Sequence, residues 1–188
     1  MPEGQRADAR RNYERILAVA VDEVAAHGAN ASLEQIARVA GVGSATVRRH
    51  FPSRRALLEA VSHKRIEDLS DRARELAGTG ESGSVLLAWL HEVVDYSATA
   101  RGLAAVLVPD GAEVGPAHVN GCAATLEDAA SPLLQDAVRD GAVSSEASLA
   151  DLLALIAGIA MATEHYPDPA AQAHRLFQLA FTGLAPQR

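Results

Sequence analysis

The octapeptide RRHFPSRR, residues 48–55, concentrates four arginines and one histidine in a chain of 188 residues whose formal net charge is -7. Guanidinium groups bind phosphate oxygens through paired hydrogen bonds, and a local excess of positive charge is typical of a surface that meets a polyanion. A solvated, charged surface is the alternative interpretation, and composition alone does not separate the two. The secondary-structure elements that position these side chains have to distinguish a phosphate-binding surface from a solvated one.

Charge is divided unevenly along the chain. Residues 1–65 carry 11 Lys and Arg against 7 Asp and Glu, whereas the remainder holds 6 basic and 17 acidic residues. A basic amino-terminal part joined to an acidic remainder indicates that only the first part meets a polyanion. The single cysteine, Cys122, excludes an intramolecular disulfide, and no signal peptide or membrane-spanning run is predicted. We therefore expect a cytoplasmic protein.

Two helices are predicted before the basic octapeptide. Apolar residues at intervals of three and four predict a helix over residues 6–27, and Gly28 is placed to end it. Ser32 is a favourable N-cap for a second, shorter helix, and Gln35 three residues later predicts a capping box. Gly41 is placed to end this second helix.

A third short helix contains the first half of the octapeptide. It is expected to begin at Gly43 or Ser44 and to end before Pro52, because the residue that precedes a proline disfavours the helical conformation. Ser53 can then cap a long helix over residues 54–76. Two short helices joined by a glycine-containing turn predict a helix-turn-helix, whose second helix lies in the major groove of DNA.

The helix predicted to enter the groove starts with small residues, which let the backbone come close to the base edges. Phe51 anchors its other end in a small core, and the arginines then flank the groove where the phosphates lie. On this reasoning the residues that face DNA are Gly43, Ser44, Ala45, Thr46, Arg48, Arg49, His50, Arg54 and Arg55.

The stretch SLEQIARVAGVGSATVRRHFPSRRALLEAV, residues 32–61, resembles the DNA-binding signature of the TetR family of bacterial transcriptional regulators, and the resemblance extends back to about residue 11. The resemblance implies a homodimer. Each subunit would have a three-helix DNA-binding head over residues 1–53, a connecting helix over residues 54–77 and a helical body over residues 78–188 that binds a small molecule and dimerises.

The resemblance also implies roles for individual residues. Family positions that contact phosphate correspond to Ser32, Thr46, His50 and Arg54, and base-facing positions correspond to Gly43, Ser44, Ala45 and Arg48. The family usually has serine at position 43, glycine at 45 and an aromatic residue at 48, so this chain departs from it at the groove. The guanidinium of Arg48 can bind a phosphate or form hydrogen bonds with a guanine base, and the sequence is compatible with both contacts.

The body is predicted to be helical throughout, which makes the fold class all-α. After a glycine-rich break at residues 78–84, apolar spacing indicates helices near residues 86–93, 118–139, 149–163 and 173–184, with a kink or break at Pro132. The last two helices are strongly apolar. We expect them to form a four-helix dimer interface with their copies, rather than only the core of one subunit, through Leu152, Leu155, Ile156, Ile159, Leu176, Phe177 and Phe181.

The body shows no diagnostic motif for an effector. Its polar-tipped or soft groups are the candidates for a pocket, and they are Trp89, His91, Tyr96, His118, Cys122 and Tyr166. Metal-ligand spacing, a phosphate loop and a catalytic constellation are all missing from the sequence, so we expect no metal, no cofactor and no catalytic residue.

These observations predict a ligand-responsive regulator, most simply a repressor that a small-molecule effector releases from a palindromic operator on double-stranded DNA. One alternative is a DNA-binding regulator controlled by a protein partner or by oxidation of Cys122. A helical enzyme is the alternative from another class, and nothing in the sequence supplies its nucleophile or base.

Overall fold

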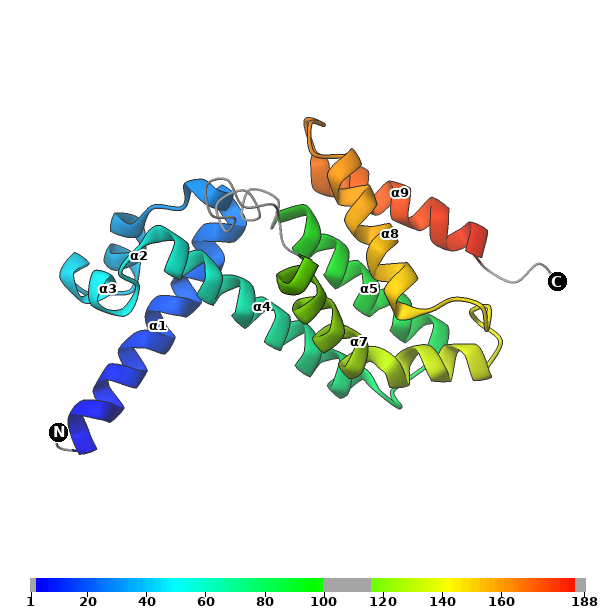
Figure 1. Ribbon diagram of the computed structural model, residues 1–188, viewed down its shortest axis with the longest axis horizontal. Helices are drawn as coiled ribbons and strands as arrows, with labels where there is room; N and C mark the ends of the chain where they lie inside the picture. The colour runs from blue at the N-terminus through cyan, green and yellow to red at the C-terminus, as the bar shows by residue number, and fades with distance from the viewer. Residues whose placement is uncertain (1–2, 100–115, 185–188) are drawn as a thin grey trace. The chain divides into compact units, whose positions relative to one another are not determined.

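The structure is a computed structural model that describes residues 3–99 and 116–184. Within these ranges every regular element is a helix, so the all-α prediction is confirmed (Figure 1). None of the helices in the described ranges is both long and apolar enough to cross a membrane. The chain divides into two compact units, and the division falls inside the long helix α4, between Lys64 and Arg65.

The first unit, called the head below, contains α1 (Glu3–His27), the short 3-10 helix η1 (Gly28–Asn30), α2 (Leu33–Val39), α3 (Ser44–His50) and the first turns of α4 (Arg54–Leu76). Each helix turns its apolar stripe inward, and α1, α2 and α3 gather around the start of α4 (Figure 1). The buried residues are Ile16, Leu17, Ala20, Val24, Ala31, Ile36, Ala37, Ala40, Val47, Phe51, Leu57, Leu58 and Val61.

The turn between α2 and α3 requires a glycine. Gly41 has φ +64°, a left-handed conformation in which an added β-carbon is strained even though no neighbour lies within 4 Å. The turn is closed by hydrogen bonds from the Val42 amide to the Ala37 carbonyl (3.0 Å) and from the Gly41 amide to the Arg38 carbonyl (3.2 Å). This geometry fixes the angle at which α3 leaves α2.

The start of α2 is capped differently from the prediction. The Ser32 hydroxyl accepts a hydrogen bond from the Gln35 amide at 3.2 Å, which is the expected half of a capping box. The other half is wrong, because the Ser32 amide donates to a carboxylate oxygen of Glu23 on α1, 3.2 Å away. The Gln35 side chain instead accepts from Arg38. Glu23 on α1 therefore supplies the hydrogen-bond acceptor for the N-cap amide of α2.

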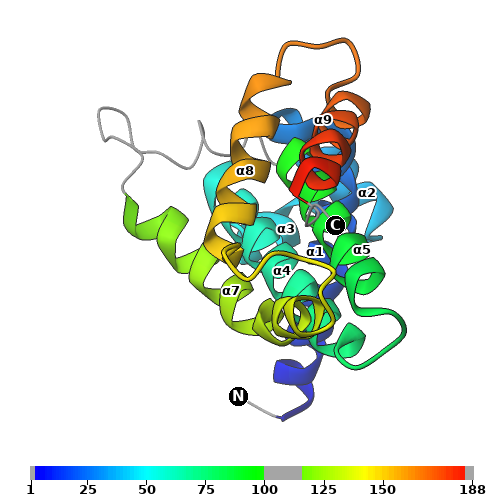
Figure 2. The ribbon, with the colours of Figure 1, turned by 90° about the vertical axis from the view of Figure 1, so that its right-hand side faces the viewer.

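The second unit, called the body below, continues α4 from Arg65 and adds α5 (Ser82–Thr99), α7 (Pro116–Arg139), α8 (Leu149–Ala162) and α9 (Pro169–Leu184). α5 packs against α7, α8 and α9 around the fully buried Trp89 and Phe177. Figures 1 and 2 show α8 and α9 lying side by side. α7 continues through Pro132 as one helix, and the helix is bent along its length (Figure 1), so the proline does not break it.

α8 begins with a complete capping box that the sequence analysis did not identify. The Ser148 hydroxyl accepts from the Asp151 amide at 3.1 Å, and the Ser148 amide donates to the Asp151 carboxylate at 3.2 Å. A further hydrogen bond from the Ser148 hydroxyl stabilises the charged carboxylate and lowers the pKa of Asp151. The box sets the first turn of a helix whose other residues are nearly all apolar.

Candidate nucleic-acid interface

The first turn of α3 presents backbone and small side chains to solvent. Gly43 is the N-cap, with extended dihedral angles and no side-chain cap, and it is followed by the exposed Ser44 and Ala45. Thr46 is partly buried and its amide donates to the Gly43 carbonyl at 2.8 Å. Val47 is fully buried and attaches the helix to the core of the head. No long side chain therefore projects from the exposed side of this turn, and another molecule can approach its backbone closely.

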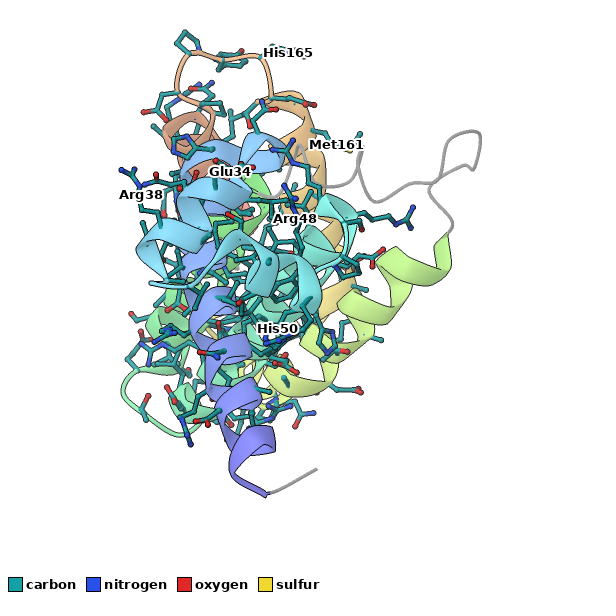
Figure 3. The ribbon with its side chains drawn as sticks, turned by 90° about the vertical axis from the view of Figure 1, so that its left-hand side faces the viewer. Glu34, Arg38, Arg48, His50, Met161 and His165 are labelled. Atoms are coloured by element: carbon teal, nitrogen blue, oxygen red, sulfur yellow. The ribbon has the colours of Figure 1, made fainter. Side chains whose placement is uncertain are left out.

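Arg48 and Arg49 leave the last turn of α3 as exposed cations. No carboxylate among the described residues lies within ion-pair distance of either guanidinium. Figure 3 shows Arg48 on the outside of the head together with Glu34 and Arg38 of α2, both of which are exposed. Neither α2 residue was among the predicted contacts, although their positions one turn apart on a short helix place them on one face.

His50, predicted to contact phosphate, is partly buried. Its ring meets the ring of Tyr13 edge to face, with centroids 6.0 Å apart, and Phe51 stacks on the same tyrosine at 5.1 Å. The Nε2 atom of His50 is buried and has no hydrogen-bond partner among the residues that the structure describes. A phosphate contact by this ring therefore has to use Nδ1, and the ring is part of the contact between α1 and α3.

The two arginines at the start of α4 are engaged within the head. Arg54 donates from Nη2 to the carbonyl oxygen of Ala31 at 2.7 Å. Arg55 donates to Glu59, one turn along α4, at 2.8 Å, and both side chains are about two-fifths exposed. An exposed pair of this kind contributes only about 0–1 kcal/mol, so Arg55 can exchange Glu59 for another anion.

Comparison with known proteins gives two family matches. Residues 16–61 match the model for bacterial regulatory proteins of the tetR family, and residues 81–186 match the model for the C-terminal domain of SbtR-like transcriptional regulators. A comparison with curated proteins finds no match.

Solved structures agree with the family matches. The TetR transcriptional regulator SCO0520 from Streptomyces coelicolor is 33% identical, with a TM-score of 0.75, over 94% of this chain and 99% of that one. The TetR transcription regulatory protein from Mycobacterium vanbaalenii is 32% identical, with a TM-score of 0.70, over 97% of this chain and 99% of that one.

This chain belongs to the TetR family. It is therefore a DNA-binding transcriptional regulator, and the helix-turn-helix formed by α2 and α3 is its DNA-binding element.

Of the residues predicted to line an effector pocket in this TetR-family regulator, four have side chains that the structure describes: Trp89, His91, Tyr96 and Tyr166. Trp89 is fully buried, and its indole nitrogen donates to the Leu69 carbonyl at 2.9 Å, so it belongs to the core. Tyr166 follows α8 and is 51% exposed. Tyr96 is partly buried on α5. The side chains of His118 and Cys122 lie outside the described residues.

His91 belongs to a polar network that ties α5 to α9. Its Nδ1 lies 2.8 Å from Nδ1 of His174, and the two rings stack with centroids 5.0 Å apart. Nε2 of His174 lies 2.6 Å from a carboxylate oxygen of Asp95, and Nε2 of His91 lies 3.2 Å from the Gln178 side-chain oxygen. Only one of the two facing Nδ1 atoms can carry a proton in this contact.

The two partners of His91, His174 and Gln178, were not predicted, because they lie 83 and 87 residues away in the chain and no local spacing joins them to His91. Among the described residues, no cluster of three or more His, Cys, Asp or Glu side chains could hold a metal ion.

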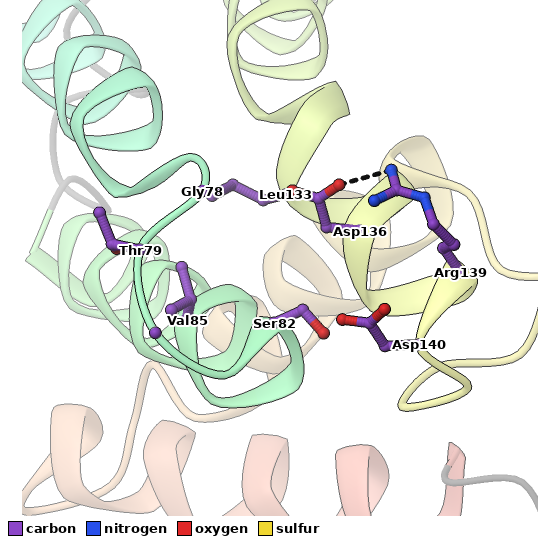
Figure 4. Close-up of a pocket in the computed structure, with 9 residues that line it drawn as sticks. Gly78, Thr79, Ser82, Val85, Leu133, Asp136, Arg139 and Asp140 are labelled. Atoms are coloured by element: carbon purple, nitrogen blue, oxygen red, sulfur yellow. Dashed lines mark hydrogen bonds and ion pairs between the residues drawn. The ribbon is translucent and has the colours of Figure 1, made fainter.

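A cavity of about 200 Å³ lies between the turn that follows α4 and the end of α7 (Figure 4). Arg139 donates to Asp136 at 2.6 Å on its wall, and the Ser82 hydroxyl is buried without a hydrogen-bond partner in the described part of the chain. Sites for drug-sized ligands occupy about 300–1,000 Å³ and are mostly apolar. This small polar cavity contains none of the predicted pocket residues, and we do not assign the effector to it.

The predicted dimer residues need a correction. Leu152, Ile156 and Phe177 are at most 2% exposed within the single chain, so they form its core and cannot be the first atoms to meet a second copy. Leu155, Ile159, Leu176 and Phe181 are partly buried. The strongly exposed large apolar residues of these two helices are Met161 (74%) and Leu179 (60%). The predicted set therefore includes residues of the inward stripe of each helix, and the assignment of α8 and α9 to a dimer interface stays a prediction.

Proposed function

We propose that this regulator is a homodimeric, cytoplasmic repressor that binds a palindromic operator and leaves it when a small-molecule effector binds the body. Residues 1–53 form the DNA-binding head, residues 54–77 connect it, and residues 78–188 bind the effector and dimerise. α3 enters the major groove, so that a dimer reads two half-sites about 34–36 Å apart.

One observation carries the proposal: the smooth, exposed start of α3 lies on the same short helix as two unpaired guanidinium groups. Exposed small residues at positions 43–45 allow close approach to base edges. Arg48 and Arg49 supply positive charge that no described carboxylate neutralises. Phosphate contacts of this kind provide most of the sequence-independent affinity for DNA.

The remaining phosphate contacts come from the edges of the helix-turn-helix. We assign them to the Ser32 hydroxyl, Thr46, Nδ1 of His50 and the donors of Arg54 that Ala31 leaves unused. A guanidinium has five N–H donors, so one bond to a carbonyl leaves Arg54 able to bind a phosphate as well.

The outer faces of α8 and α9 support the dimer. α8 exposes Ala154, Ala157 and Gly158, whose small size lets a second helix approach closely, and Met161 projects beside them. A β-carbon added at Gly158 meets nothing within 4 Å. Leu179 is a second exposed apolar residue, on α9, which packs against α8. Exposed apolar surface of this extent is typical of a protein interface.

The effector site is proposed between α5 and α7, two helices that pack together. Tyr96 on α5 is partly buried, and residues 118 and 122 belong to the first turns of α7. An effector that favours one state by roughly 1–3 kcal/mol changes DNA affinity about 5- to 150-fold, which is sufficient to release an operator.

The test is to select bound duplexes from a random pool with the purified protein. We expect a palindromic site, bound with a steep dependence on salt concentration. Arg48→Ala should change the selected sequence if Arg48 reads a base, and should leave it unchanged if Arg48 binds phosphate. A folded protein that enriches no sequence at low salt would contradict the proposal. A reporter gene placed behind the selected operator distinguishes repression from activation.

A further inference from the structure

One peptide group in the head is held from both sides by charged side chains of two other helices. The group joins Ala31 to Ser32, immediately before α2. Its carbonyl oxygen, that of Ala31, accepts a hydrogen bond from Nη2 of Arg54 at 2.7 Å. Its N–H, that of Ser32, donates to a carboxylate oxygen of Glu23 at 3.2 Å. α1 and α4 thus hold opposite edges of the same peptide plane.

This peptide group has no partner within a helix. η1 closes with a bond from the Ala31 amide to the Gly28 carbonyl at 3.1 Å, and the Ser32 carbonyl accepts the first bond of α2 from the Ile36 amide at 2.9 Å. The carbonyl of Ala31 and the amide of Ser32 lie between these two systems. Ala31 is only 2% exposed, and buried backbone groups need partners. Two charge-assisted bonds, each stronger than a neutral one, meet this need.

We infer that Glu23 and Arg54 are positioning residues for DNA binding. By fixing the plane of this peptide they fix Ser32, whose hydroxyl caps α2 and which we have proposed as a phosphate contact. The inference rests on that proposed contact. Arg54 is also the first residue of α4, so Glu23 and Arg54 together connect the start of α2 to α1 and to α4.

Glu23 is the better residue of the pair to test, because its negative charge by itself would repel DNA phosphates and weaken DNA binding. Its side chain is only 14% exposed, and the same oxygen lies 3.8 Å from Nε2 of His27. If Glu23 acted only through its charge, its removal would strengthen DNA binding. If it positions Ser32, its removal weakens DNA binding. The two roles predict opposite signs.

The experiment compares Glu23→Ala, Glu23→Gln and Asp22→Ala by fluorescence anisotropy with a labelled duplex of mixed sequence. Asp22 is an exposed neighbour on α1, so its removal deletes the same charge without touching the peptide. We expect Glu23→Ala to bind about tenfold more weakly, the effect of losing one charge-assisted hydrogen bond. Glu23→Gln keeps an acceptor oxygen and should bind within about twofold of the unmodified protein.

Two further measurements separate positioning from a phosphate contact and from folding. The slope of log affinity against log salt concentration should be unchanged in Glu23→Ala, whereas Arg54→Ala should lower it by about 1. Amide exchange followed by NMR should show the Ser32 N–H protected in the unmodified protein and in Glu23→Gln, and exposed in Glu23→Ala.

Equal binding by Glu23→Ala and Asp22→Ala, or weak binding by Glu23→Gln, would overturn the inference. So would rapid exchange of the Ser32 amide in the unmodified protein. If the unmodified protein does not bind duplex DNA at low salt, the proposed function is wrong, and this inference is wrong with it.

Discussion

At the residue scale, the four arginines of the octapeptide have three different environments. Arg48 and Arg49 are exposed, Arg55 shares its charge with Glu59, and Arg54 donates to a backbone carbonyl. The residue type is the same in each case, and only the neighbours differ. Two cations are therefore fully available to phosphate, one is available by exchange, and one combines binding with positioning.

Arg49→Ala should weaken binding to all duplexes alike, because its guanidinium is an exposed cation at the end of α3 that pairs with no carboxylate in the described ranges. We expect the slope of log affinity against log salt concentration to fall by about 1, measured by anisotropy over a salt series. Arg74→Ala is the matched control, since Arg74 already pairs with Asp71 at 2.7 Å in the last turn of α4. Equal slopes for the two variants would remove Arg49 from the interface.

At the element scale, the head depends on how short helices start and stop. α2 and α3 have seven residues each, which is too short for a helix to be stable without tertiary contacts. Their ends are set by Ser32, Gly41, Gly43 and the proline after Phe51, and their buried faces attach them to α1. The angle between α2 and α3 is consequently a property of the turn at Gly41.

Replacing Gly41 and Gly43 by the same residue should have different effects. Gly41→Ser forces a β-carbon into a left-handed conformation at φ +64° and should lower the free energy of unfolding by about 1–2 kcal/mol. Gly43→Ser has an ordinary φ of -70° and adds a better N-cap, so stability should be unchanged or slightly higher. Urea unfolding measures both. Unchanged stability in both variants would show that the turn does not require glycine at position 41.

At the scale of the whole molecule, α4 belongs to both compact units, and α8 and α9 expose apolar residues that no other described residue covers. Two linked heads bind a palindrome with an effective local concentration that raises affinity by 10²- to 10⁴-fold over one head alone. The proposed dimer is therefore a requirement for tight operator binding.

Met161→Glu should separate the subunits, because a charge would be buried at the centre of the proposed interface. Analytical ultracentrifugation should show a monomer, and affinity for the selected palindrome should fall by at least about 100-fold. Ala88→Glu adds the same charge at an exposed position of α5 and should leave both properties unchanged. A Met161→Glu protein that remains dimeric would place the interface elsewhere.

Local signals in the sequence determined the helices and the DNA-binding element. Helical spacing, N-caps and helix-ending glycines and prolines all act within about one turn, so they can be identified without a structure. The connecting helix was predicted over residues 54–76 and is Arg54–Leu76 in the structure. The TetR resemblance added the roles of Ser32 and Arg48, which spacing by itself does not assign.

Only the tertiary structure decided which groups meet across the chain. Glu23 reaches Ser32 from another helix, Arg54 reaches a carbonyl 23 residues earlier, and His91 meets His174 across 83 residues. The structure likewise turned Leu152 and Phe177 inward and Met161 outward on helices that are apolar on nearly every side. A helix that is apolar on all sides does not specify which side faces inward. Hydrogen bonds between distant residues depend on how the helices pack. The inward face and these hydrogen bonds are therefore determined only in the folded chain.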